Sequence, residues 1–268
     1  MFAVGRKGQE YKMQSKTPQE ITDSENICQR KDLAAAQASP PDPLPAGFKS
    51  FMQREQQEKI DRYHILNKIA VKGGILFTGS SLMEQFPILE LMMNAGIHKI
   101  AYNRAVGGFT TDDMLRNMDA QIFGTEPSRI FINIGTNDIA NAAVTFRQAL
   151  NHTLQNYAEI LRQIKERLPE TDVYLMAYYP VNDTDKVPDE VWAKNMFVNR
   201  NNQNIPIANT AVEKLAAEFG YHYINANAGL TDERGMLKKE FTVEGIHMYA
   251  NGYQVVFENL KKYLLIEA

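Results

Sequence analysis

Five short apolar runs, separated by longer segments, constrain the fold of this chain more than any other feature. Each run holds apolar residues at consecutive positions, as strands do when helices cover both faces of their sheet. The segments between the runs are long enough for the helical crossovers that join parallel neighbours. The runs occupy residues 73–81, 98–106, 128–138, 172–180 and 221–230. They predict an open, parallel, five-stranded sheet between two helical layers, for which 2-1-3-4-5 is a common strand order.

The segments between the runs carry helical signals. Residues 110–123 open on Thr and Asp, which cap a helix and complement its N-terminus. Residues 142–169 repeat apolar side chains every three or four positions and end in proline, and a last helix is expected over residues 251–266. Before the first strand, residues 48–70 predict one amphipathic helix that packs on the body of the protein, with a partner-binding helix as the alternative.

The chain changes character near residue 47. Residues 1–47 are polar without a period and contain, near their end, four of the 11 prolines within six positions. This composition predicts a polar N-terminal arm with a proline-rich linker, and an arm without a function of its own is the simplest interpretation. Residues 48–268 are then expected to form a single domain, which the predicted helix over residues 48–70 leads.

Composition limits the partners that this protein is expected to have. The 29 basic and 32 acidic residues give a net charge of −3, so the basic surface that nucleic-acid binding needs is not indicated. The single cysteine, Cys28, excludes an internal disulfide and fits a reducing compartment. No run approaches the roughly 18 apolar residues of a membrane span, and the N-terminus does not resemble a secretion signal. We expect a soluble, cytoplasmic protein.

Four polar blocks lie where the predicted strands end or where the last helix begins, and in an open α/β sheet ligands bind beyond the carboxyl ends of the strands. The blocks are GSSLME at residues 79–84, NRAVGG at 103–108, GTND at 135–138 and EGIH at 244–247. In this order they resemble the blocks of the SGNH hydrolases, also called the GDSL family of esterases and lipases. The resemblance implies a flavodoxin-like three-layer α/β/α sandwich, which agrees with the sheet predicted from the apolar runs.

The resemblance places the nucleophile of the family on Ser81, with Ser80 where the family usually has aspartate. A serine at a junction of strand and helix exposes its Oγ above the sheet, where a base can activate it. The alternative is that Ser81 only caps the helix that follows. The change at Ser80 leaves the nucleophile in place and affects only the geometry of the loop.

The resemblance also supplies a base and an acid. His247 is the only one of the five histidines in such a block, and it would take the proton of the nucleophile and later deliver it to the leaving alcohol. Three positions earlier the family carries aspartate, whereas this chain has Glu244. Glutamate orients the histidine in some related triads. Asp232, a backbone carbonyl or water would be the alternatives.

Three oxyanion donors follow from the same resemblance: the backbone N–H groups of Ser81 and Gly108, and the side-chain amide of Asn137. A glycine allows the backbone to approach a ligand closely, and a neutral amide donates a hydrogen bond without carrying charge. Gly108 and Asn137 are also typical turn residues, which is the competing interpretation. In the long polar segment 182–209, Trp192 and Phe197 are expected either to line the substrate pocket or to join a helical core.

Together these residues predict a serine esterase that hydrolyses short-chain carboxylic esters through an acyl-serine intermediate. The sequence carries no motif for a nucleotide, metal or other cofactor, so none is expected. The expected partner is a small-molecule ester, such as an acetylated sugar. A carbohydrate O-deacetylase or acyltransferase could use the same site, and a non-catalytic binding module on a hydrolase fold is the alternative from another class. Acyl-chain length, alcohol moiety and oligomeric state are left open.

Overall fold

The computed structural model describes residues 46–266, and these form a five-stranded parallel sheet between helices. The strands are β1 (Ile75–Gly79), β2 (Ala101–Asn103), β3 (Arg129–Asn133), β4 (Asp172–Met176) and β5 (His222–Ile224). Their order across the sheet is β2-β1-β3-β4-β5, and every neighbouring pair is parallel. Both the predicted fold class and the predicted strand order are therefore confirmed.

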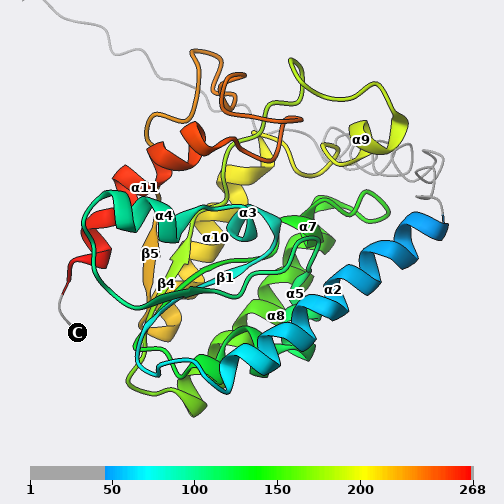
Figure 1. Ribbon diagram of the computed structural model, residues 1–268. Helices are drawn as coiled ribbons and strands as arrows, with labels where there is room; N and C mark the ends of the chain where they lie inside the picture. Colours follow the sequence, from blue (N-terminus) through cyan, green and yellow to red (C-terminus); the bar gives the residue numbers. More distant parts are fainter. Residues whose placement is uncertain (1–45, 267–268) are drawn as a thin grey trace, which may run out of the picture. The chain divides into compact units, whose positions relative to one another are not determined.

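Helices cover both faces of this sheet (Figure 1). On one side α8 (Phe146–Arg167) packs against α10 (Asn204–Phe219), and on the other α4 (Ile88–Asn94) packs against α11 (Ala250–Leu264). The central strands β1 and β3 are fully buried, whereas the edge strands β2 and β5 have only three residues each and are partly exposed. No helix within residues 46–266 is long and apolar enough to cross a membrane.

A row of stacked rings fixes the register across four strands. Phe77 pairs with Phe131, Phe131 with Tyr174 and Tyr174 with His222. The ring centroids of these pairs lie 4.9, 5.0 and 4.6 Å apart, with the planes nearly parallel. Aromatic neighbours on one face of a sheet stabilise the pairing beyond the area that they bury. The ends of β1 and β3, which carry two of the polar blocks, are held level with each other in this way.

The segment expected as one helix over residues 110–123 is broken. It forms α5 (Thr111–Arg116), α6 (Met118–Gln121) and a short 3-10 turn, η1 (Phe123–Thr125). Asn117, which separates the first two, adopts a φ of −124°, outside the helical range. Its side chain donates to the Asp113 carbonyl, as Asn often does when it competes with helical bonding.

The leading helix forms α2 (Ala46–Asn67), in place of residues 48–70, and its packing differs from the prediction. An amphipathic helix would bury its large apolar side chains, yet Phe51 and Ile65 are 55% and 65% exposed. The packed face carries the buried Ile60 together with polar side chains. The expected arm lies almost entirely outside the described residues.

Candidate active site

Ser81 is the first residue of α3 (Ser81–Glu84), directly beyond β1. The exit from the strand requires Gly79, because a Cβ there would lie 2.0 Å from the carbonyl oxygen of Asn133 in the neighbouring strand. Ser80, where the family usually has aspartate, is 1% exposed. A hydroxyl at this buried place avoids the cost of burying a carboxylate charge. Ser81 itself is only partly buried and stands at the carboxyl end of the sheet.

His247 contacts Ser81, although it lies near the other end of the sequence. Its Nε2 lies 2.8 Å from the Ser81 Oγ, although 166 positions separate the two residues. The loop before α11 holds the histidine, because the backbone N–H of Val243 and the hydroxyl of Thr242 both donate to the His247 carbonyl. The structure therefore brings together the hydroxyl and the imidazole that the sequence predicted as nucleophile and base.

Glu244 binds the other side of the imidazole. Its Oε1 lies 2.5 Å from His247 Nδ1 and also accepts the backbone N–H of His247. Burial alone would raise the pKa of Glu244, but the hydrogen bonds of His247 and the positive charge of Arg200 outweigh it, so the pKa is lowered. The carboxylate is therefore the stable form beside the imidazole. Asp232, the alternative acid, instead forms an ion pair with Arg234.

The three predicted oxyanion donors lie at the same edge. Gly108 has a φ of +78°, a conformation that side chains rarely adopt. Within residues 46–266, no partner is recorded for the backbone N–H of Gly108 or of Ser81. The Asn137 amide donates one hydrogen to the Phe109 carbonyl at 3.0 Å, which leaves its second hydrogen for a ligand.

Three residues that the sequence analysis did not select contact this site. Arg200 is 3% exposed, and its Nη1 lies 3.4 Å from the Asn137 Oδ1. Burial lowers the pKa of Arg200 to about 10, while the charge of Glu244 opposes that shift. Gln56 and Glu84 bind the backbone of Gly107, next to the predicted donor. Glu84 lies in the GSSLME block but was not given a role, and no motif marks Gln56 or Arg200, because the partners of all three are backbone atoms or residues distant in sequence.

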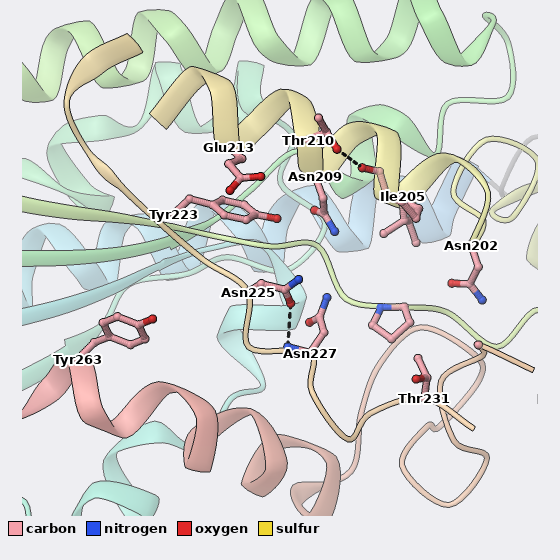
Figure 2. Close-up of a pocket in the computed structure, with 13 residues that line it drawn as sticks. Asn202, Ile205, Asn209, Thr210, Glu213, Tyr223, Asn225, Asn227, Thr231 and Tyr263 are labelled. Carbon is pink, nitrogen blue, oxygen red and sulfur yellow. Dashed lines mark hydrogen bonds between the residues drawn. The ribbon is translucent and has the colours of Figure 1, made fainter. Parts of the chain in front are cut away.

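The long segment after β4 has a mixed role. Phe197 is 8% exposed and packs over Gly245, so it belongs to the core and not to a pocket wall. The side chain of Trp192 lies outside the described part of the chain. Residues from the end of this segment line a polar cavity of about 690 Å³ beside β5, which is drawn in Figure 2. None of the residues of the Ser81 site lines it.

One cluster among the described residues has the spacing of a cation site. Oxygen or nitrogen atoms of Asp112, Asp138 and His152 lie within 4.8 Å of one another. These atoms already bind each other or neighbouring side chains: Asp112 pairs with His152 at 2.7 Å, and Asp138 accepts from Thr111. The expectation that the reaction needs no metal stays a prediction.

The comparison with protein-family models matches residues 89–255 to the GDSL-like lipase/acylhydrolase family. The chain belongs to this family. It is thus a carboxylic ester hydrolase, as the sequence predicted. The comparison with curated protein sequences gives no significant match.

Solved structures agree with this assignment. A protein from Streptococcus pneumoniae, provisionally described as a platelet activating factor, is 32% identical with a TM-score of 0.71, over 81% of this chain and 96% of that one. A GDSL-like lipase from Bacteroides thetaiotaomicron is 20% identical with a TM-score of 0.61, over 76% and 96% of the chains. An acetyl-xylooligosaccharide esterase from Geobacillus stearothermophilus is 14% identical with a TM-score of 0.54, over 74% and 96%. The last two show the fold alone.

Proposed function

We propose that the protein hydrolyses short-chain carboxylic esters through an acyl intermediate on Ser81. The observation that carries the proposal is the continuous chain from Ser81 Oγ through the imidazole of His247 to the carboxylate of Glu244. An imidazole held between a hydroxyl and a carboxylate is the arrangement that activates a serine.

The reaction has two halves. Ser81 Oγ attacks the ester carbonyl while His247 Nε2 takes its proton, and the carbonyl oxygen becomes an oxyanion. His247 then gives the proton to the leaving alcohol, and the acyl group stays on Ser81. Water enters, gives a proton to His247 and attacks the acyl carbonyl. The second tetrahedral intermediate collapses to the free acid, and the proton returns to Ser81.

Two groups support these steps. The N–H groups of Ser81 and Gly108 and the free amide hydrogen of Asn137 are proposed to hold the oxyanion in both halves, and preorganised donors of this kind are usually the largest catalytic contribution. Glu244 is proposed to keep the proton of the neutral imidazole on Nδ1, so that Nε2 faces the serine as an acceptor. It also stabilises the imidazolium that forms.

A short acyl group and a polar alcohol suit the surroundings of the site. A cavity of about 400 Å³ adjoins Asn137, and most of its lining side chains are polar, among them Thr110, Gln148 and His152. These polar side chains can hydrogen-bond the hydroxyl groups of a polar alcohol, which favours an ester such as an acetylated sugar. The fold neighbour from Geobacillus acts on acetylated xylooligosaccharides, so an acetylated sugar is the second candidate substrate.

The first prediction tests the nucleophile. Aryl esters from acetyl to octanoyl and an acetylated xylooligosaccharide are assayed with the wild type and with Ser81→Ala, and a fluorophosphonate probe labels the active serine. Ser81→Ala is expected to lower kcat by about three orders of magnitude or more, with the fold intact and the label lost. We expect the acetyl ester to have the highest kcat/KM of the series.

Other results would contradict the proposal. Equal hydrolysis by wild type and Ser81→Ala would exclude this serine as nucleophile, and a wild type without label or turnover would favour the binding module. Transfer of the acyl group to an added alcohol, faster than hydrolysis, would identify an acyltransferase.

A further inference from the structure

The peptide group between Gly107 and Gly108 is held from its carbonyl side by a side chain of α2. Gln56 Nε2 donates to the Gly107 carbonyl at 2.8 Å. The same amide lies directly over the next residue, since a Cβ on Gly108 would stand 2.7 Å from Gln56 Nε2. Gln56 is half-buried, 51 positions away from its acceptor along the chain.

Planarity connects this bond to the reaction. In a trans peptide the C=O of one residue and the N–H of the next point in opposite directions within one plane. None of the described peptide bonds is cis. When Gln56 fixes the direction of the Gly107 carbonyl, it also fixes the direction of the Gly108 N–H, which is one of the proposed oxyanion donors.

The amide end of Gly107 is held as well. Its backbone N–H donates to Glu84 Oε2 at 2.9 Å, and Glu84 Oε1 forms an ion pair with Lys59 of α2 at 2.6 Å. A Cβ on Gly107 would lie 3.7 Å from the Ser81 Cβ, so this doubly bound residue lies against the nucleophile. Rotation of the Gly107–Gly108 peptide would have to break the bond to Gln56.

Other contacts of α2 fix the chain just before this peptide. Tyr63 donates its hydroxyl to the Ala105 carbonyl at 2.8 Å. Asn67 accepts from Arg104 Nε at 3.0 Å. The helix thus binds residues 104, 105 and 107, and Gln56 makes the contact closest to the oxyanion site.

We infer that Gln56 is a positioning residue of the esterase site: it orients the Gly108 N–H toward the oxyanion through the carbonyl of the same peptide. The inference rests on the proposed function. A donor that is free to rotate must be reoriented in each transition state, whereas a preorganised donor avoids that cost. The bond to Gln56 should therefore stabilise the transition state and leave ground-state binding of the ester almost unchanged.

The test compares Gln56→Met and Gln56→Glu with Gln57→Ala in the full-length protein. Met keeps most of the side-chain volume without a donor, and an ionised Glu keeps the shape but repels the carbonyl and the oxyanion. Gln57 is the matched control: it is exposed on the same helix, and its recorded side-chain bond is to Asp61. Steady-state kinetics on an acetyl ester are normalised to the serines labelled by the fluorophosphonate after complete reaction.

We expect Gln56→Met to lower kcat roughly tenfold to a hundredfold with KM within about twofold, and Gln56→Glu to lower it further. Affinity for a trifluoromethyl ketone, whose Ser81 adduct carries an oxyanion, should fall in parallel. A purely structural role would instead lower the melting temperature or the labelled fraction and leave the normalised kcat unchanged. Gln57→Ala should match the wild type.

Ser81→Ala, run beside these variants, separates the two proposals. If the wild type depends on Ser81 but Gln56→Met keeps its kcat, or changes only KM, the positioning inference is wrong and the esterase proposal stands. If hydrolysis does not depend on Ser81, both are wrong.

Discussion

Glu244 is one methylene longer than the aspartate that the family usually carries at this position, and its carboxylate reaches His247 Nδ1 at 2.5 Å. The longer side chain folds back toward its own loop, where the same oxygen also accepts the backbone N–H of His247 at 3.1 Å. Two bonds to one oxygen hold the side chain in a turn around the imidazole. The lowered pKa keeps this group ionised at neutral pH.

The second prediction concerns this carboxylate. Glu244→Gln should lower kcat by about 10² to 10⁴, because the amide can donate to Nδ1 and stabilise the tautomer that presents a proton, and not a lone pair, to Ser81. Glu244→Asp should keep more activity than Glu244→Gln, since it retains the charge. The measurement is kcat on the acetyl ester.

Glu240→Gln is the matched control for these variants. Glu240 lies exposed in the same loop, and no side-chain bond of its carboxylate is recorded among the described residues. Wild-type kcat in Glu244→Gln would show that His247 does not need this carboxylate and would remove Glu244 from the proposed mechanism.

At the scale of single helices, α8 shows how closely a local signal can specify an element. The apolar repeat predicted a helix over residues 142–169, and the observed helix spans Phe146–Arg167. Thr145 and Gln148 form a capping box at its start, in which each side chain binds the backbone N–H of the other. The residue at which α8 begins was not predicted, because the apolar repeat does not identify the capping residue.

The third prediction tests this cap. Thr145→Ala should lower the free energy of unfolding by about 1 kcal/mol, because the backbone N–H of Gln148 at the start of α8 loses its partner. Thr145→Ser should retain most of the stability, and kcat should not change in either variant. Equilibrium denaturation measures the difference. Equal stability of Thr145→Ala and the wild type would mean that the cap adds nothing to α8.

The helix α2 shows where a sequence pattern is insufficient. Its apolar residues do not lie on one face, and Phe51 and Ile65 remain exposed. The surface that it covers is partly loop backbone, whose buried carbonyls need hydrogen-bond donors. Gln56 and Tyr63 supply them. Hydrophobic periodicity identifies a face that packs on apolar side chains, so it cannot identify a face that packs on a main chain.

Over the whole molecule, the sheet and the catalytic array were predictable for a common reason. Buried parallel strands appear as apolar runs, and the parallel arrangement places the carboxyl ends of all strands at one edge. Ser81 and His247 could therefore be paired across 166 positions, with the family resemblance choosing them. Arg200 and Gln56 could not be identified as site residues in this way, because each contacts the site from a segment without a motif. Only the folded structure shows which loop or helix face packs there.

Asp138, beside Asn137, couples the stability of the molecule to pH. It is 7% exposed and accepts the backbone N–H and the hydroxyl of Thr111. Burial raises its pKa to about 6, although the bonds from Thr111 and from the backbone partly oppose the shift. The pKa in the unfolded chain is about 3.9. Between these values the folded state binds more protons than the unfolded state, so this residue contributes more to stability as the pH falls from about 6 to about 4.

The fourth prediction isolates this contribution with Asp138→Asn. The unfolding free energy of the wild type minus that of the variant should rise by roughly 2 to 3 kcal/mol as the pH falls from 7 to 4, since a shift of one pKa unit corresponds to about 1.4 kcal/mol. The neighbouring pair of Asp112 and His152 also titrates, but it is present in both proteins and largely cancels in the difference. Urea denaturation at pH 7, 6, 5 and 4 gives the values. A difference that does not depend on pH would show that Asp138 titrates alike in the folded and unfolded chains, and that its burial costs the charged form nothing.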